Sequence, residues 1–473
     1  YMSTSKLSRS LGLRYVIVVV IANIIGSGVY KKIAPMAAEL GSSGWVLAAW
    51  AIAGLITLMG ALCNAEVAGL LADTGGEFAY YKKIYNKFFA FMFGWSLFTV
   101  IQTAAISSIA YVFAQSLDSI VHLPQLLQDY SNFSIGGVFY PFAGFSVKLA
   151  AILLIILLTW INSRGIKTGA GVSNATLLLV FAGIGLIIFF GLSSPTAHVQ
   201  RSLSLAISNH STITISSLFT AMLAAFWAYQ GWYSIGFIGG EIKDAKHTLP
   251  KGVVIGVFIV IAIYLLVNAT YLSLLSIPAL TDIYKSGNQI AAIEAVRTFW
   301  GDNGALFISV LILITTLGCT NASILTGARP YYAMATKGLF FSKAAILNKE
   351  QVPANSLNMQ CIWASVLVLS GSFDQLTDML IFAVFIYYGA TAVGVFILRR
   401  KMPDAERPYK VWGYPFVPAI FILFCTGLFF NTFFTRPREA AIGLALMLTG
   451  VPMYFWFKRK GRMSEPGLGE EQN

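Results

Sequence analysis

A glycine–serine–glycine triplet interrupts the first long apolar segment of the chain, where its residue types could bind an ion. Gly26, Ser27 and Gly28 follow an apolar run that begins at Val16. Each glycine costs a helix about 1 kcal/mol relative to alanine, so the triplet should break the helix. A helix that restarts near Gly28 points free N–H groups and the positive end of its dipole into the break. Such a break attracts a carboxylate.

A second apolar segment, five apolar segments further along, has the same peculiarity. Gln230 and Gly231 stand at the middle of a run that begins near residue 213. Interrupted spans at matching positions of two halves indicate a midplane site between inverted repeats. Glycines that serve only close helix packing would give a similar local pattern. Because the two breaks recur at matching positions, we favour a site.

The two breaks together offer the groups that a zwitterionic amino acid needs. Backbone N–H groups around Ser27 and Gly28 suit its carboxylate, and the Ser27 hydroxyl adds a hydrogen-bonding group. Freed carbonyls suit its ammonium, and they belong to Ile24, Ile25, Gly26, Phe226, Trp227 and Ala228. The centres of both segments carry no Asp, Glu, Lys or Arg, so a charged side chain would lack a counter-ion there. We therefore expect a small to mid-sized neutral amino acid.

Lys167, at the start of the fifth apolar segment, has two interpretations. It is either a surface anchor whose side chain reaches the membrane interface, or an ammonium that reaches inward. In the second case it would contact carbonyls of the first segment and Ser323, in the place of a sodium ion. A tethered cation would make transport independent of sodium. If burial lowered its pKa, it would also carry a proton.

Several other side chains have a structural and a functional interpretation. Tyr264 is either a core aromatic or a hydroxyl donor to the broken region, and Trp227 is either a buried aromatic or a gate over the substrate. The small residues of segment 318–323 suit close packing or a pocket wall. The shape of the pocket would depend on Trp227, Tyr233, Gln230, Cys319 and Asn321.

Composition assigns the whole chain to the membrane. Of its 473 residues, 57% are hydrophobic and 11% are charged, and the mean hydropathy is +0.73. In a globular protein, about a quarter of all residues are charged. Apolar runs of about 20 residues recur and predict an all-α integral membrane protein. The twelve predicted spans are 13–37, 44–71, 88–118, 147–163, 168–192, 213–238, 252–275, 303–328, 357–373, 377–399, 415–434 and 438–458.

The basic residues fix the expected orientation. They concentrate on alternate loops, which places both termini in the cytoplasm and explains the net charge of +12 without a nucleic-acid partner. We expect a cytoplasmic N-terminus over 1–12, inverted repeats over 13–192 and 213–399, two further spans over 415–458, and a cytoplasmic tail over 459–473. Segment 77–87 suits a cytoplasmic interfacial helix, and segment 288–300 suits a short outer helix.

Other function classes lack their residues. The cysteines lie within or beside apolar segments and the histidines lie in loops, and neither set has metal-ligand spacing. We therefore expect no metal, no cofactor and no enzymatic activity. A channel would need a selectivity ring or a pore-lining pattern, and none is visible.

Several motifs resemble the amino acid–polyamine–organocation superfamily, and within it the L-type amino acid transporter family. They occur in the expected order at 24–30 (IIGSGVY), 65–81 (AEVAGLLADTGGEFAYY), 227–232 (WAYQGW), 240–250 (GEIKDAKHTLP) and 321–323 (NAS). The resemblance implies the LeuT fold with discontinuous spans 1 and 6, a rocking bundle of spans 1, 2, 6 and 7, and sodium-independent exchange. It implies that residues 26–28 bind the carboxylate, that Trp227 is the gate, and that Lys167, Ser323 and Tyr264 form the sodium-like site.

Two departures from the family narrow these expectations. At the position of Gln230, similar relatives that carry cationic substrates have an acidic residue. The glutamine therefore argues against arginine or lysine as a substrate. Loop 119–146 lacks the cysteine that joins animal members to a glycoprotein heavy chain, so we expect no such partner and a monomer. Short tails suit a bacterial protein of the cell membrane. The leading hypothesis is a neutral amino acid exchanger; the alternatives are a proton-coupled symporter of the same fold and, remotely, a membrane enzyme.

Overall fold

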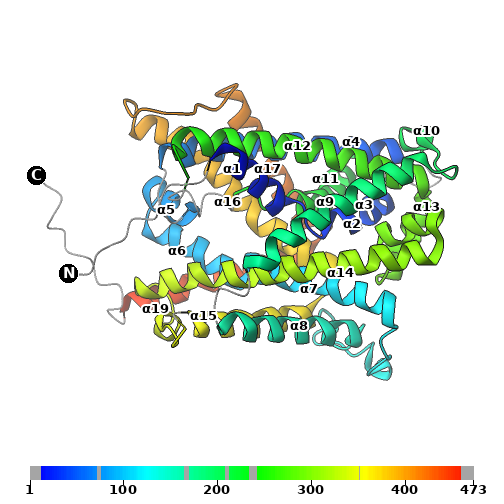
Figure 1. Cartoon of the computed structure of the whole chain (residues 1–473). Helices are drawn as coiled ribbons and strands as arrows, with labels where there is room; N and C mark the ends of the chain where they lie inside the picture. The colour runs from blue at the N-terminus through cyan, green and yellow to red at the C-terminus, as the bar shows by residue number, and fades with distance from the viewer. Residues whose placement is uncertain are drawn as a thin grey trace, which may run out of the picture.

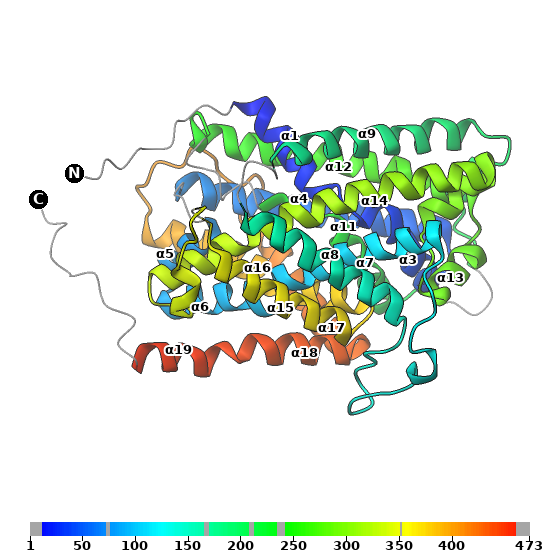
Figure 2. The same ribbon diagram turned by 60° about the horizontal axis from the view of Figure 1, so that its bottom comes forward.

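The computed structural model describes residues 12–71, 76–164, 170–207, 212–233, 242–350 and 352–459. Within these ranges the regular structure is helical, apart from isolated bridge residues, which are Ile135 paired with Phe139, and Ile242. Most helices run lengthwise along one axis (Figures 1 and 2). Lys167 lies outside the described residues, as do parts of both predicted tails.

The helices of the first half are α1 (Leu13–Ile24), α2 (Gly28–Lys31), α3 (Ile33–Leu40), α4 (Ser43–Leu70), α5 (Gly76–Ile84), α6 (Lys87–Ser96), α7 (Gln102–Val121), α8 (Phe145–Ser163), α9 (Ala170–Ser193) and α10 (Val199–Ser202). A π-helical turn over Leu97–Ile101 joins α6 to α7. The second half contains α11 (Ile215–Ala228), α12 (Ala245–Leu274), α13 (Ile277–Ser286), α14 (Ala291–Thr336), α15 (Ala354–Ser370), α16 (Phe373–Lys401), α17 (Phe416–Thr435), α18 (Pro437–Leu448) and α19 (Gly450–Arg459).

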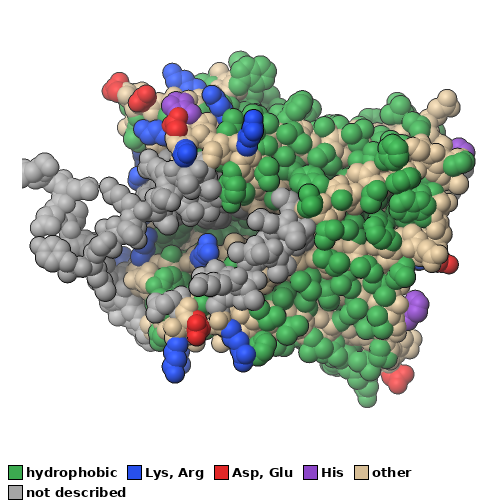
Figure 3. All heavy atoms as spheres, in the orientation of Figure 1, with side chains coloured by type: hydrophobic (Ala, Val, Ile, Leu, Met, Phe, Trp, Pro, Cys, Tyr) green, Lys and Arg blue, Asp and Glu red, His purple; other side chains and the backbone are tan. Residues whose placement is uncertain are grey.

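Helices of membrane-spanning length confirm a multi-pass membrane protein. Eight stretches of the described chain are long and apolar enough to cross a bilayer: α4, α6 with α7, α8, α12, α14, α16, α17, and α18 with α19. Three further apolar helical segments, which are α1, Leu178–Ser193 of α9, and α11, stand where the first, fifth and sixth spans were predicted. On the face of the molecule that Figure 3 shows, Lys and Arg side chains gather at the end that holds α5. Hydrophobic side chains cover much of the remaining length of this face.

Two helices stop inside the apolar body of the protein. α1 ends at Ile24, and helical structure resumes at Gly28. The residue between α2 and α3, Lys32, keeps a helical φ of −71°, so residues 28–40 form one half-helix, which is named the outer half-helix after the orientation predicted from the basic residues. α11 ends at Ala228, and the chain then turns through Gly231, whose φ of +119° is rarely adopted by other residues. Both breaks fall where the sequence predicts them.

The helices around the breaks are packed against each other. α12 lies against α1 and α4, α11 lies against α3 and α4, and α7 lies against α14 and α8. The two segments predicted as non-spanning helices, 77–87 and 288–300, contain α5 and residues 291–300 of α14, which precede a kink at Gly301. This arrangement brings the two breaks together at the centre of the chain's apolar core.

Candidate functional site

The two breaks touch through their glycines. A Cβ atom added to Gly28 would lie 2.7 Å from the Cα atom of Ala228 and 3.1 Å from Cδ1 of Trp227. A Cβ atom added to Gly231 would collide with the carbonyl oxygen of Asn23. Each break therefore depends on a glycine that admits the backbone of the other. Any larger side chain would force the two apart.

Tyr264 of α12 ties the two breaks together. Its hydroxyl lies 3.1 Å from the carbonyl oxygen of Ile24 and 2.7 Å from that of Ala228. A hydroxyl has one hydrogen, so it donates to one carbonyl at a time. These are the last residues of α1 and α11, where carbonyls lose their helical partners. Tyr264 is thus both fully buried and hydrogen-bonded to the broken region.

The first break combines a buried polar group with open space. Ser27 is 3% exposed, and its hydroxyl makes no hydrogen bond to a described residue. Ile24 and Ile25 are buried beside it. A Cβ atom added to Gly26 would meet no heavy atom of a described residue within 4 Å. There is room for a ligand group next to Gly26, unlike next to Gly28.

Trp227 is packed between the first break and Phe373. It is 7% exposed, packs on the glycine at position 28, and meets the ring of Phe373 edge-on at 6.2 Å between centroids. The ammonium groups of Lys31 and Lys32 stand over the same phenylalanine ring, 4.9 Å and 4.5 Å from its centroid. A gate role for Trp227 is compatible with this position between the break and the outer helices.

Lys31 and Lys32 were not identified as site residues from the sequence, yet both are buried and bonded across the protein. Lys31 donates to Oε1 of Gln115 on α7 at 2.5 Å. Lys32 lies 2.7 Å from a carboxylate oxygen of Asp374 and 2.6 Å from the hydroxyl of Thr377, both on α16. A pair of lysines at the end of an apolar run was the only available signal. Their partners, 84 and 342 residues away, are not visible in it.

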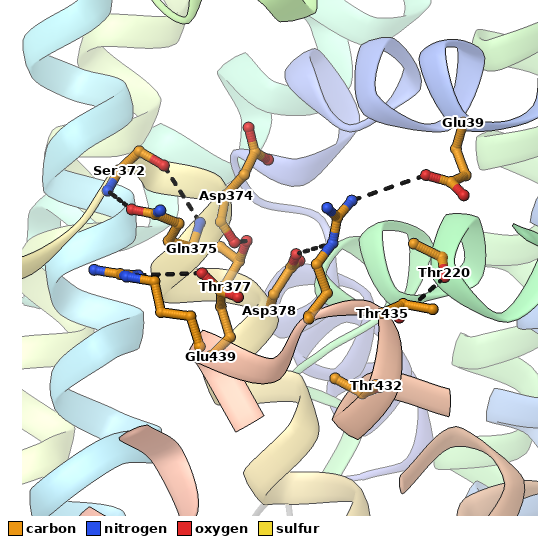
Figure 4. A network of polar contacts seen from close by, with 12 residues as sticks. Glu39, Thr220, Ser372, Asp374, Gln375, Thr377, Asp378, Thr432, Thr435 and Glu439 are labelled. Carbon is orange, nitrogen blue, oxygen red and sulfur yellow. Dashed lines mark hydrogen bonds and ion pairs between the residues drawn. The ribbon is translucent and has the colours of Figure 1, made fainter. Parts of the chain in front are cut away.

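The start of α16 places the carboxylate for Lys32. Ser372 and Gln375 form a capping box, which fixes the first turn of the helix and holds Asp374 in it. Nearby, Arg436 lies 3.5 Å from Asp378 and 3.9 Å from Glu39 of α3. Figure 4 shows Asp374 and Asp378 on one side of this charged cluster and Glu39 on the other. The cluster ties the outer half-helix 28–40 to α16 and to the turn before α18.

The second break faces α16. Tyr388 donates its hydroxyl hydrogen to Oε1 of Gln230 at 2.8 Å, and its ring packs against those of Trp232 and Tyr233. The amide of Gln230 is therefore oriented by a neighbouring helix. Tyr233 is buried in the same aromatic group.

The predicted residues of α14 divide between two neighbourhoods. Asn321 accepts a hydrogen bond from Asn162 of α8 at 2.8 Å, and the carbonyl of Ser323 accepts one from Gln102 of α7 at 3.0 Å. Cys319 is a free, partly buried thiol on the same helix. No contact between Ser323 and Lys167 is described, because Lys167 lies outside the described residues.

No group of three or more His, Cys, Asp or Glu side chains among the described residues is placed to hold a metal ion. The chemistry available at the breaks is that of backbone N–H and carbonyl groups, hydroxyls and an amide. These groups bind polar ligands by hydrogen bonds. They contain no nucleophile paired with a base.

Membrane-length helices around two helix breaks that touch define a multi-pass helical membrane protein with a central polar site. The chain belongs to the amino acid permease family, whose model matches residues 11–457. This confirms the resemblance to the amino acid–polyamine–organocation superfamily.

Similar proteins include transporters from bacteria and animals. The serine/threonine exchanger SteT of Bacillus subtilis is 29% identical over 96% of this chain and 98% of its own length. The large neutral amino acids transporter small subunit 2 of Homo sapiens is 27% identical over 95% of this chain and 80% of its own length. The b(0,+)-type amino acid transporter 1 of Mus musculus is 26% identical over 96% of this chain and 89% of its own length.

Proposed function

We propose that this protein is a sodium-independent exchanger of small to mid-sized neutral amino acids that works by alternating access. The contact between Gly28 and Ala228, which joins the two breaks, carries the proposal. The similar proteins are named as amino acid transporters and exchangers, which supports the same function. Those names also point away from an enzyme.

The substrate binds as a zwitterion across the breaks. Its carboxylate accepts hydrogen bonds from the N–H groups around Ser27 and Gly28, and its ammonium donates to carbonyls of the two breaks. The open space beside Gly26 accommodates the substrate backbone. Trp227 covers the site, and Gln230, held by Tyr388, faces it from the second break. Since the breaks carry no charged residue, neutral side chains are favoured.

The fold that goes with this function is the LeuT fold, with twelve spans and inverted repeats over 13–192 and 213–399. In this arrangement α1 to α3, α4, α11 and α12 belong to the moving bundle, and their mutual packing supports that grouping. The protein lies in the cell membrane with both termini in the cytoplasm. The basic residues at the end that holds α5 support this orientation.

Alternating access requires contacts that open and close on each side. Lys31 and Lys32 join the bundle to α7 and α16 on the proposed outer side. While these contacts exist, the outer path to the breaks is closed. Opening outward separates Lys32 from Asp374, and the freed charges then meet water. Lys167 supplies a tethered cation in place of sodium, with Ser323 as its partner.

The protein works without a disulfide-linked heavy chain. Loop 119–146 contains no cysteine, and the cysteines at positions 63, 319, 361 and 425 are free. A monomer is therefore the proposed working unit.

Uptake by proteoliposomes tests the function directly. Purified protein takes up labelled alanine, serine or leucine with or without amino acid inside, with sodium present or replaced, and across a pH step. Uptake that needs internal amino acid and is indifferent to sodium and pH is expected. Uptake into empty vesicles driven by a proton gradient would instead establish a proton-coupled symporter.

A further inference from the structure

The loop between α7 and α8, residues 122–144, exposes several large apolar side chains. We call them the loop patch; they are between 37% and 59% exposed and comprise Leu126, Leu127, Tyr130, Phe133, Ile135, Val138 and Tyr140. The same loop contains one acidic residue, Asp129, and no Lys or Arg. Single exposed apolar residues are common on proteins, but a group of them on one segment marks a surface that contacts another protein or a membrane.

The backbone of the loop is held in place by cations of two neighbouring helices. The ammonium of Lys148, on α8, donates a hydrogen bond to the carbonyl of Tyr140 at 2.7 Å. The guanidinium of Arg438, on α18, donates one to the carbonyl of Val138 at 3.0 Å. These bonds use carbonyl oxygens of the loop, so they fix its course and leave the side chains of the loop patch exposed.

Aromatic contacts join the loop patch to the start of α8. The ring of Phe142 lies 6.3 Å from that of Tyr130 and 5.6 Å from that of Phe133, measured between centroids. Phe142 also lies 5.9 Å from the ring of Phe145, the first residue of α8. All three separations are within the range of aromatic contacts. The loop patch is therefore positioned relative to the first turn of α8.

The length of α8 places this turn at the surface of the bilayer. The helix has 19 residues, or about 29 Å, close to the ~30 Å of a hydrocarbon core. Near its other end, the guanidinium of Arg164 lies 3.8 Å from the ring centroid of Trp160, and both residue types are frequent at a membrane–water interface. The exposed side chains between the two ends face lipid; they include Leu153, Ile156 and Leu157.

The loop projects sideways from the helices. In Figures 1 and 2 it leaves the protein beside the start of α8, whereas α13 lies further towards the end of the long axis. A loop that projects sideways at the end of a membrane-spanning helix lies over the bilayer. Because it carries aromatic and aliphatic side chains without Lys or Arg, it suits a neutral lipid interface and needs no anionic lipid.

We propose that the loop patch is a membrane anchor, which inserts its apolar side chains into the boundary between headgroups and acyl chains on the proposed outer side. The partner is the bilayer itself, continuous with the lipid around α8. Insertion of Phe133 and Ile135 removes apolar area from water, which supplies the driving force. Tyr130 and Tyr140 keep their hydroxyls at the level of the headgroups. The anchor does not depend on the proposed amino acid exchange.

Fluorescence quenching in lipid nanodiscs tests the anchor, because both faces of a nanodisc are open to solutes. Phe133→Cys is labelled with an environment-sensitive NBD fluorophore in phosphatidylcholine nanodiscs. A lipid with a nitroxide near the headgroup end of its chain should remove most of the fluorescence, and aqueous iodide should remove little. Protein without the added cysteine, treated in the same way, gives the background from the native cysteines at positions 63, 319, 361 and 425.

Lys285→Cys is the matched control. Lys285 is exposed on α13, so its label should be quenched by iodide and little by the nitroxide lipid. If Phe133→Cys does not fold, Ile135→Cys reports on the same surface. Equal iodide quenching at positions 133 and 285 would overturn the anchor. Protection of position 133 from both quenchers would also overturn it, because protein and not lipid would then cover the loop patch.

Lipid composition tests the chemistry of the anchor. Nanodiscs with added phosphatidylglycerol should give the same quenching at position 133 as phosphatidylcholine alone, because the loop has no Lys or Arg to bind anionic headgroups. Quenching by the nitroxide lipid that appeared only with phosphatidylglycerol would overturn an apolar anchor.

Discussion

The ammonium of Lys32 lies 2.7 Å from a carboxylate oxygen of Asp374, across 342 residues of chain. The Lys32 side chain is fully buried, and that of Asp374 is 22% exposed. Lys31 makes a parallel contact with Gln115, whose own amide donates to the carbonyl of Gly287 at 2.7 Å. The outer half-helix is thus held to α7, to α16 and to the turn after α13.

Removing one member of the Lys32–Asp374 pair should destabilise the protein. Asp374→Asn leaves the buried ammonium without its carboxylate, and we expect a loss of about 3 kcal/mol. The double variant Lys32→Met, Asp374→Leu should recover much of that loss, because no buried charge remains unpaired. Thermal unfolding in detergent measures both. Equal stability of Asp374→Asn and wild type would contradict the pairing.

Gly28→Val should abolish amino acid binding. The added side chain would lie 2.7 Å from the Cα atom of Ala228, so the two breaks must separate. Binding of labelled substrate to purified protein measures the effect. Gly185→Val is the control and should bind normally, because a Cβ atom there would meet no heavy atom of the described part of the chain within 4 Å. Normal affinity in Gly28→Val would disprove the site at the breaks.

Tyr264→Phe should slow exchange. The variant loses the hydroxyl that lies 3.1 Å and 2.7 Å from the carbonyls of Ile24 and Ala228. Loss of one buried hydrogen bond to these carbonyls corresponds to about 1 kcal/mol, or several-fold in rate if it is made during transport. Exchange of labelled alanine measures it. Tyr130→Phe, at an exposed outer position, serves as the control; a matching decline there would point to a non-specific effect.

The sequence predicted the breaks better than the contacts that surround them. Gly26, Gly28 and Gly231 are visible because glycine inside an apolar run is a local signal. The Lys32–Asp374 pair is not local: Lys32 stands in the last part of predicted span 13–37, and Asp374 stands between predicted spans 357–373 and 377–399, where charges are usually solvated anchors. Only the packing of the outer half-helix against α16 brings them together.

Lys167→Ala should stop exchange without unfolding the protein. Lys167 stands outside the described residues, so this prediction rests on its proposed role as a tethered cation at the sodium-like site. Exchange rate and melting temperature are measured together. Lys251→Ala, an exposed lysine of α12, is the control and should exchange at the wild-type rate. Unchanged kinetics in Lys167→Ala would make Lys167 a surface anchor.

The buried carboxyl of Glu77 should make stability depend on pH. Glu77 lies in α5, outside the membrane-spanning helices; it is 2% exposed, and its Oε1 atom has no hydrogen-bond partner among the described residues. Burial raises the pKa of Glu77 from 4.5 to about 8. In this pH interval the folded protein keeps a proton that the unfolded chain has released. The contribution of Glu77 to the free energy of unfolding is therefore fully present below pH 4.5 and is lost as the pH rises towards 8.

The decline should be on the order of 1 kcal/mol per pH unit. Glu77→Gln keeps the shape of the side chain and cannot ionise, so its melting temperature should change less between pH 5 and pH 8 than that of wild type. Asp129→Asn, in an exposed outer loop, should decline as wild type does. An equal decline in wild type and Glu77→Gln would show that another group carries the pH dependence. A smaller decline in the glutamine variant alone assigns the pH dependence to the Glu77 carboxyl.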